Sequence, residues 1–246
     1  MQPSLVILTG AGISADSGLA TFRGAGGLWE GQRVEDVATP EAWIRDPQLV
    51  WRFYQMRRAA LGTVEPNPAH HALAHLEREL DQRGVPFLLV TQNVDDLHER
   101  AGSKPLHMHG ELAVLRCESC GTRLSDTQHF DPESFLGCEA CGFERLRPDV
   151  VWFGEMPYHM ERIERALGGC THFAAIGTSG SVYPAAGFLA AARAVGAQTF
   201  VVGLDAPDNL HPGDTFLEGR AARVVPLLVE EVLSLLASLG AESRGR

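Results

Sequence analysis

Short apolar segments that end in turn residues recur along the chain, and their pattern limits the folds open to it. The segments are LVILTG (5–10), VPFLLVTQN (85–93), THFAAIGTS (171–179) and AQTFVVGLD (197–205). Continuous apolar runs of this length are typical of strands buried on both faces of a parallel sheet. Because helical patterns separate these segments, we predict an α/β fold with a doubly wound, parallel Rossmann-like sheet.

Proline and glycine mark the ends of the predicted helices. Asp46-Pro47 and Asn67-Pro68 each read as an N-cap followed by proline at the first helical position. The segment PAAGFLAAARAVG predicts a helix that ends at Gly196. Residues 222–240 predict a short strand followed by an amphipathic closing helix.

Two stretches interrupt the alternation of strands and helices. Residues 112–150 are polar and carry paired cysteines, and residues 31–80 are helical. We read both as insertions that together form a small domain. The remaining segments, 1–30, 81–111 and 151–246, are then expected to form the large Rossmann-like domain.

Charge and hydropathy narrow the class of protein. The net charge is −10, which argues against nucleic acid as a partner. No run reaches the roughly 18 apolar residues needed to cross a membrane. The first predicted strand starts so early that no targeting segment is visible. We therefore expect a cytoplasmic protein with no membrane partner and, with almost no N-terminal arm, a monomer.

The cysteines predict a metal site. Cys117-x-x-Cys120 and Cys138-x-x-Cys141 are separated by 17 residues, and each pair is followed by glycine. This spacing matches a four-cysteine zinc ribbon, in which the closed ligand shell makes the metal structural. The alternative is two pairs of reduced thiols without metal. We read Cys170, outside the pairs, as a buried small hydrophobe.

A glycine-rich turn follows the first predicted strand. Gly10-Ala11-Gly12 with Ala15 completes G-x-G-x-x-A between a strand and a helix, the setting in which backbone N–H groups bind a pyrophosphate. A simple tight turn would give the same letters. The following segment is rich in glycine and contains Phe22-Arg23, as in a loop that folds over a ligand.

Polar residues gather after the second predicted strand. Gln92, Asn93 and Asp95 follow it directly, at the sheet edge where such folds bind ligands. An Asx-type cap on the next helix is the alternative. Further on, LHMHGE holds His107 and His109. His109 is the better general-base candidate because Gly110 allows close backbone approach, although a lone histidine is more often structural.

Two more segments could contact ligands. In RPDVVWFGE (147–155), an extended stretch opens at Gly154, so it could pair with an added peptide strand or simply return to the core. In GTSGSVYPA (177–185), Thr178 and Ser179 offer hydroxyl and N–H groups to a ribose or phosphate. An ordinary turn between strand and helix explains this second segment equally well.

The helix that starts at Asp46-Pro47 carries an unusual arginine. Its predicted apolar face consists of Leu49, Val50, Phe53, Met56, Ala60 and Leu61. Arg57 projects near the middle of this face, with Tyr54 three residues earlier on the same side. A guanidinium in apolar surroundings needs a partner, which is either an internal carboxylate or an anionic ligand.

Together and in this order, the motifs resemble the sirtuins, a family of NAD-dependent protein-lysine deacylases. The resemblance covers residues 4–235 and rests on GAGISADSGLATFRG, TQNVDDLHERAG, HMHGEL, the two cysteine pairs, VVWFGE and GTSGSVYPA. It implies a large doubly wound domain and a small zinc-and-helix module. NAD, as co-substrate, and the acyl-lysine of a protein or peptide would then meet in the cleft between them.

The resemblance also implies residue roles. His109 would be the general base, and Asn93 and Asp95 would share the catalytic site. The residues expected to bind NAD are Gly10, Ala11, Gly12, Ser14, Phe22, Arg23, Gln92, Asn93, Asp95, Gly177, Thr178, Ser179 and Ala221. Substrate would contact Val151, Phe153 and Gly154. Where the family often has asparagine near the adenosine ribose, this chain has VGLDAP, with Gly203 in the expected place.

One branch of the family carries Tyr-x-x-Arg in the acyl-lysine pocket, and Tyr54 and Arg57 match it. The resemblance therefore implies removal of succinyl or malonyl groups beside acetyl. The expected products are free lysine, nicotinamide and 2′-O-acyl-ADP-ribose. Two alternatives stay open: an NAD hydrolase or mono-ADP-ribosyltransferase, and a non-catalytic zinc-ribbon scaffold or NAD sensor.

Overall fold

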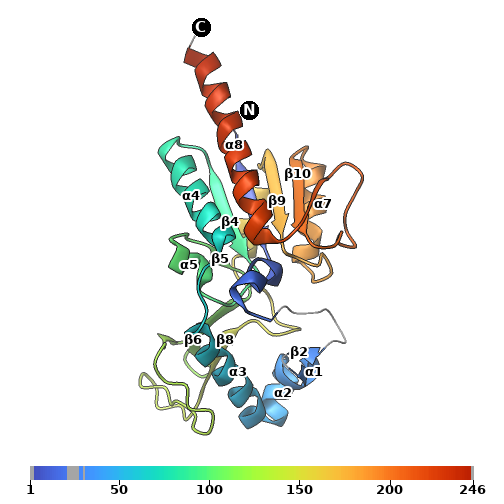
Figure 1. The fold of residues 1–246 in the computed structure, drawn as a ribbon. Helices are drawn as coiled ribbons and strands as arrows, with labels where there is room; N and C mark the ends of the chain where they lie inside the picture. Colours follow the sequence, from blue (N-terminus) through green and yellow to red (C-terminus); the bar gives the residue numbers. More distant parts are fainter. Residues whose placement is uncertain (1–2, 21–27, 30, 245–246) are drawn as a thin grey trace.

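The large sheet of the protein is parallel throughout. The structure is a computed structural model that describes residues 3–20, 28–29 and 31–244. The strands are β1 (Leu5–Thr9), β4 (Phe87–Thr91), β5 (Leu106–His107), β9 (His172–Ile176), β10 (Gln198–Gly203) and β11 (Thr215–Glu218). They lie in the order β11-β10-β9-β1-β4-β5 (Figure 1). The direction of winding reverses between β1 and β9, so a ligand crevice is expected at their carboxyl ends.

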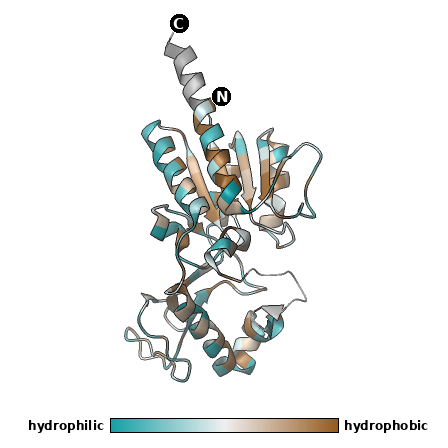
Figure 2. Ribbon diagram, in the orientation of Figure 1, coloured by the Kyte–Doolittle hydropathy of each residue, from teal (hydrophilic) through white to brown (hydrophobic). Residues whose placement is uncertain are grey.

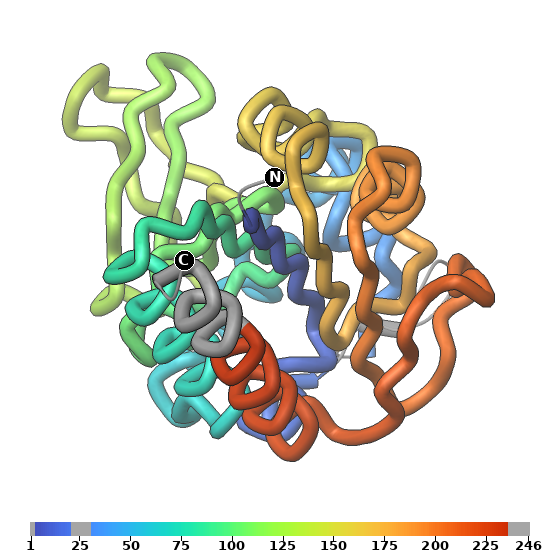
Figure 3. The backbone as a smooth tube through the Cα atoms, turned by 90° about the horizontal axis from the view of Figure 1, so that it is seen from above, coloured from blue at the N-terminus to red at the C-terminus, as the bar shows by residue number. Residues whose placement is uncertain are grey.

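Helices cover both faces of this sheet. Alternate side chains of β1 point to opposite faces. Leu5 and Ile7 share a buried core with α4 (Pro68–Gln82) and α8 (Ala221–Arg244). Val6 and Leu8 share the core on the other face with α6 (Met160–Leu167) and α7 (Phe188–Ala194). In Figure 2 the strands are mostly brown and α4 is largely teal, and Figure 3 shows α8 against α4 from above.

Short helical elements lie in the connections that follow the strands at the carboxyl edge of the sheet. They are the 3-10 helices η1 (Ala11–Ile13), η2 (Ala15–Ser17) and η3 (Ala185–Gly187), and the helix α5 (Leu97–Ala101). Both η1 and η2 directly follow β1, so the glycine-rich segment leads into tight helical turns. These turns bring the residues after β1 close to those after β4 and β9.

A smaller module lies below the large sheet in Figure 1. Its helices are α1 (Val34–Val37), α2 (Pro40–Arg45) and α3 (Pro47–Leu61), and its strands are β2 (Leu28–Trp29), β3 (Gln32–Arg33), β6 (Gly110–Cys117), β7 (Arg123–Ser125) and β8 (Leu146–Val150). β6 pairs antiparallel with both β7 and β8. One apolar core joins α1, α2 and α3 to β6 and β8, so the two predicted insertions pack as one unit.

Most of the predicted elements are confirmed. The four apolar segments form β1, β4, β9 and β10. Asp46 caps α3 by accepting a hydrogen bond from the N–H of Leu49 at 2.9 Å, and Asn67 caps α4. The short strand predicted in residues 222–240 is wrong, because α8 already starts at Ala221 and contains Pro226. The last strand of the sheet is β11, which comes before α8 in the chain and lies at one edge of the sheet.

The boundaries of the two domains stay a prediction, but the packing bears on one of them. The predicted helical insertion, 31–80, includes most of α4. The apolar side chains of α4, such as Leu73 and Leu76, are buried against the large sheet. This contact favours a boundary before Pro68.

Within the part of the chain that the structure describes, no helix combines the length and the apolar character needed to cross a bilayer.

Candidate functional site

A cleft of about 830 Å³ runs between the carboxyl edge of the large sheet and the small module. Phe22 and Arg23 lie outside the described residues. All other residues predicted to bind NAD or substrate line the cleft: Gly10, Ala11, Gly12, Ser14, Gln92, Asn93, Asp95, His109, Gly177, Thr178, Ser179 and Ala221, and, nearer the small module, Tyr54, Arg57, Val151, Phe153 and Gly154. The fold thus brings distant segments of the sequence to one site.

Glycines let two turns pack against each other at the floor of the cleft. The N–H of Gly12 donates to the carbonyl of Gly177 at 2.8 Å. A Cβ on Gly10 would lie 2.8 Å from that carbonyl, and a Cβ on Gly12 would lie 2.7 Å from the Cα of Gly177. Gly177 itself has a φ of 63°, which favours glycine. The glycines of the G-x-G motif therefore allow the turn after β1 to pack closely against the turn after β9 at the switch point.

Ser14 is the centre of a buried polar cluster beside this floor. The amide of Asn93 donates to Ser14 Oγ at 3.1 Å, and Ser14 Oγ donates to Asp95 Oδ2 at 3.1 Å. Burial raises the pKa of Asp95 above its ordinary value. Asp95 Oδ1 also accepts from the N–H of Leu97, the first residue of α5, at 3.2 Å, so this side chain both orders the start of α5 and lines the cleft.

His70, which was not among the predicted site residues, supports this cluster from α4. Its Nδ1 accepts from the N–H of Asn67 at 3.2 Å, so the ring proton resides on Nε2. Nε2 then donates to Ser14 Oγ at 3.4 Å. Burial lowers the pKa of His70 to about 4, which keeps the ring neutral. The signal was the N3 position after the Asn67-Pro68 cap, where a side chain reaches back to the N-cap.

The structure assigns different surroundings to the two histidines of LHMHGE. His109 is half-buried and lines the cleft. Its Nδ1 lies 3.1 Å from the carbonyl oxygen of Gln92. A carbonyl only accepts, so Nδ1 carries the proton and Nε2 is the basic nitrogen. Burial lowers the pKa of His109, so the ring is neutral near pH 7.

His107 lies behind the site rather than in the cleft lining. Its Nδ1 contacts the carbonyl oxygen of Asn93 at 2.9 Å, and its Nε2 contacts Glu99 Oε1 at 2.6 Å. Burial lowers the pKa of His107, but the hydrogen bond and the charge of Glu99 outweigh it and raise the pKa overall. His107 is thus suited to hold the backbone of Asn93, whereas His109 is suited to accept a proton.

The helix α3 presents Tyr54 and Arg57 to the cleft, but its buried face differs from the predicted one. Met56 is 61% exposed, and the arginine at the centre of the buried face is Arg58. The buried face also includes Trp51 and Gln55, which were not predicted on it, whereas Ala60, which was, is exposed. Arg58 forms an internal ion pair with Asp126, at 3.1 Å. The half-buried Arg57 lies at the cleft with its guanidinium 5.7 Å from the ring of Phe53.

The predicted peptide edge leaves β8 at Val150. The N–H of Val151 donates to the carbonyl of His109 at 2.8 Å, and the N–H of Phe153 donates to the carbonyl of Ala38 at 3.0 Å. Both donors are used inside the protein, so a peptide strand would have to pair with other backbone groups of this segment. The Phe153 side chain is 44% exposed at the cleft.

The far end of the cleft lies at β10 and β11. Gly203 lines it, but its carbonyl accepts the N–H of Gly219 at 2.9 Å. Asp205, two residues further on, is exposed and also lines the cleft. A carboxylate after a strand of such a sheet can accept hydrogen bonds from ribose hydroxyls. Asp205 is therefore a better candidate for that contact than a backbone group of Gly203.

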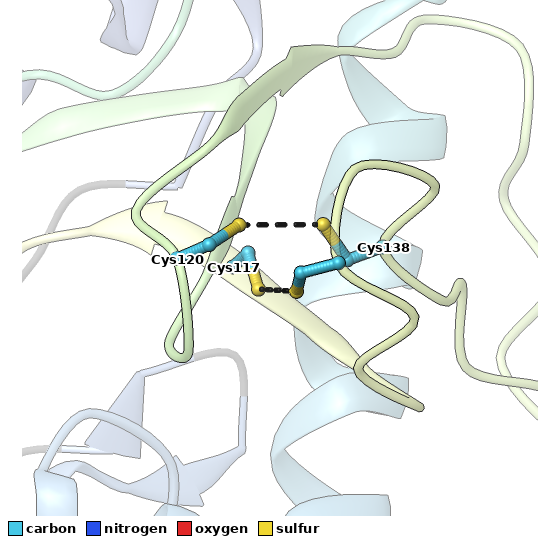
Figure 4. A group of neighbouring side chains, drawn as sticks. Cys117, Cys120 and Cys138 are labelled. Atoms are coloured by element: carbon cyan, nitrogen blue, oxygen red, sulfur yellow. Dashed lines mark hydrogen bonds between the residues drawn. The ribbon is translucent and has the colours of Figure 1, made fainter.

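The four paired cysteines form a cluster that fits a zinc ion. Their sulfur atoms all lie within 4.8 Å of one another. The Sγ atoms of Cys117 and Cys141 are 3.6 Å apart, and those of Cys120 and Cys138 are 3.7 Å apart (Figure 4). Tetrahedral Zn–S bonds of about 2.3 Å give S···S separations of about 3.8 Å. Among the described residues of the cleft lining there is no cysteine, so a zinc ion here would be structural.

Known proteins are similar to this chain in sequence and in fold. The sequence model of the Sir2 family matches residues 10–184. An NAD-dependent protein deacylase of Shewanella oneidensis is 52% identical over 95% of this chain and 96% of its own length. One from Caulobacter vibrioides is 50% identical over 94% and 97% of the two chains. A solved structure of a Sir2 homologue–NAD complex is 40% identical, with a TM-score of 0.85, over 96% of this chain and 91% of its own. The chain therefore belongs to the Sir2 family.

Proposed function

We propose that this protein removes acyl groups from lysine side chains of other proteins with NAD as co-substrate. We propose further that its acyl pocket favours acyl chains that end in a carboxylate, such as succinyl and malonyl, and accepts acetyl as well. The observation that carries the second proposal is that Tyr54 and Arg57 line the same cleft as His109 and the glycine turns. The names of the close relatives support the first proposal.

The cleft has the parts that NAD requires. The turn Gly10-Ala11-Gly12 lines the cleft directly after β1, where its backbone can face a pyrophosphate. Ser14, Asn93 and Asp95 supply hydroxyl, amide and carboxylate groups on one side, and Asp205 supplies a carboxylate on the other. When bound, NAD would supply a ribose carbon that becomes electrophilic as nicotinamide leaves.

The base for this reaction is His109. Its neutral ring holds the proton on Nδ1 toward Gln92, so Nε2 can take a proton from a ribose hydroxyl. The substrate's amide oxygen would bond to the ribose carbon that nicotinamide leaves, and the deprotonated 2′-hydroxyl would then attack the acyl carbon. Water would complete the transfer and release lysine. The expected products are free lysine, nicotinamide and 2′-O-acyl-ADP-ribose.

Tyr54 and Arg57 suit a carboxylate. The guanidinium can form two parallel hydrogen bonds to it, and the phenol can add a third. Burial raises the pKa of Tyr54 to about 12, so the phenol stays protonated and can donate.

Replacing Arg57 with methionine is expected to change acyl preference. We expect kcat/KM for a succinyl-lysine peptide to fall by about 10- to 100-fold, the size of a charge-assisted hydrogen bond. The value for the acetyl-lysine peptide should stay within about threefold, because an acetyl group offers no carboxylate. Steady-state kinetics with one peptide sequence in both acylated forms measures this.

Arg52 on the same helix provides the matched control. Its side chain is 49% exposed and pairs with Glu133 in the small module. Arg52→Met should leave both kcat/KM values close to those of the wild type. Equal losses on the two peptides in Arg57→Met would reject the pocket role of Arg57.

A further inference from the structure

We propose that Trp152 is a positioning residue for acyl selection, because its indole N–H holds the hydroxyl of Tyr54 for a carboxylate. The indole Nε1 donates to Tyr54 Oη at 3.0 Å, and both side chains are buried. This inference rests on the proposed function, since it concerns the pocket in which Tyr54 and Arg57 would bind the acyl chain.

The direction of this hydrogen bond decides what Tyr54 can do. An indole N–H can only donate, so the Tyr54 oxygen is the acceptor. The phenolic proton of Tyr54 must then point away from Trp152. Both residues line the cleft, and a hydroxyl that already accepts one hydrogen bond is a stronger donor to a second partner. Tyr54 is thus prepared to donate to an anion in the cleft.

The indole itself is held by an ion pair between the buried Arg147 and the half-buried Glu155. The guanidinium of Arg147 stacks on the Trp152 ring, 3.4 Å from its centroid. Arg147 binds both carboxylate oxygens of Glu155, at 2.8 and 2.9 Å. Glu155 in turn accepts from the backbone N–H of Trp152 at 2.8 Å. This arrangement fixes both the backbone and the ring of Trp152, so the direction of the indole N–H is fixed as well.

The same arrangement connects acyl choice to the peptide edge. Trp152 lies between Val151 and Phe153, which are predicted to contact the substrate peptide. On its other side the ring contacts Tyr54, with centroids 6.3 Å apart. One residue therefore adjoins both the peptide segment and the end of the acyl pocket.

The test is the variant Trp152→Phe, which keeps a ring but removes the N–H. We expect kcat/KM for succinyl-lysine peptide to fall by about five- to tenfold, the worth of one net hydrogen bond, mainly through a higher KM. The acetyl-lysine value should change by less than about twofold. Trp51→Phe is the matched control, since Trp51 is equally buried and its Nε1 donates to the carbonyl of Asp131 at the same 3.0 Å. It should leave the ratio of the two values unchanged.

A double variant separates positioning from general packing. In a Tyr54→Phe background the acceptor oxygen is gone, so Trp152→Phe should cause no further loss on succinyl-lysine. A further loss of the same size, or equal losses on both peptides in the single variant, would overturn the inference. If Trp152→Phe does not fold, position 152 can carry benzothienylalanine, in which sulfur replaces the N–H. The same kinetic results are then expected, and the same results would overturn the inference.

The outcomes also distinguish this inference from the proposed function. A wild-type protein without succinyl-lysine turnover would overturn both this inference and the proposed preference for a carboxylate, and turnover of acetyl-lysine would still support the deacylase. A wild-type protein that prefers succinyl-lysine, with the same preference retained in Trp152→Phe, would overturn the role of Trp152 alone.

Discussion

Replacing His109 with alanine is expected to lower kcat by about 100- to 10,000-fold, the range that a positioned general base contributes. His109 holds its Nδ1 proton toward the carbonyl of Gln92 and has a neutral ring at the cleft. The binding of NAD should change little, because the glycine turns and the cluster around Ser14 stay intact. Rapid-quench and steady-state assays measure the rate, and calorimetric titration with NAD measures the affinity.

The pH profile gives a second readout for His109. Burial lowers its pKa below the usual 6.5 of histidine, and the neutral form is the active base. We therefore expect kcat/KM to rise with pH with a midpoint below pH 6.5, and this acidic limb should disappear in His109→Ala. His75→Ala is the control, since His75 is exposed on α4. Retention of more than about a tenth of the wild-type kcat in His109→Ala would rule out its role as the base.

Loss of the cysteine cluster is expected to unfold the small module. Cys117→Ser removes a buried cysteine from the cluster. In small zinc domains, binding of the structural ion contributes an apparent free energy of about 10–16 kcal/mol. Loss of even part of this free energy should lower Tm by more than about 10 °C, because a loss of about 1 kcal/mol lowers Tm by 2–4 °C in a chain of this size. Zinc content by mass spectrometry and thermal unfolding with and without chelator measure the effect.

The loss should extend to the acyl pocket. Trp43 Nε1 donates to Glu118 at 2.8 Å, and the guanidinium of Arg58 pairs with Asp126, so α2 and α3 are tied to the zinc ribbon. We expect kcat/KM for both acyl peptides to fall with the metal content. Cys170→Ser, outside the cluster, should retain zinc and lower Tm by only a few degrees. An unchanged Tm and a full zinc content in Cys117→Ser would contradict the structural role of the cluster.

The sheet and the cleft were predictable because their signals are local. An apolar strand followed by glycine, as at Gly10 and Gly177, indicates both a buried strand and a turn at its carboxyl end. Parallel strands bring these ends together, so residues from distant segments were expected at one edge. The cysteine pairs carry their spacing in the sequence, and the close approach of their sulfur atoms agrees with it.

The parts that were missed depend on contacts between segments. The sequence did not show that α3 packs against the segment of the zinc ribbon around Asp126. We therefore expected Arg57 in the middle of the buried face, whereas the structure places Arg58 there. A short strand was expected before the closing helix, yet the chain from Ala221 onward, including Pro226, forms the single helix α8, which packs against α4 and the sheet. His70 and Trp152 act through neighbours more than 50 residues away, and no local pattern records such pairs.

The most direct measurement of the central claim is a paired kinetic assay of the wild-type protein. One peptide would be offered with NAD in two forms, carrying succinyl-lysine or acetyl-lysine, and kcat/KM compared. The account predicts turnover of both and a ratio that favours succinyl-lysine by about tenfold or more, which is about 1.4 kcal/mol of transition-state discrimination. A ratio that favours acetyl-lysine would contradict the carboxylate pocket at Tyr54 and Arg57, and NAD consumption without turnover of either peptide would contradict the deacylase itself.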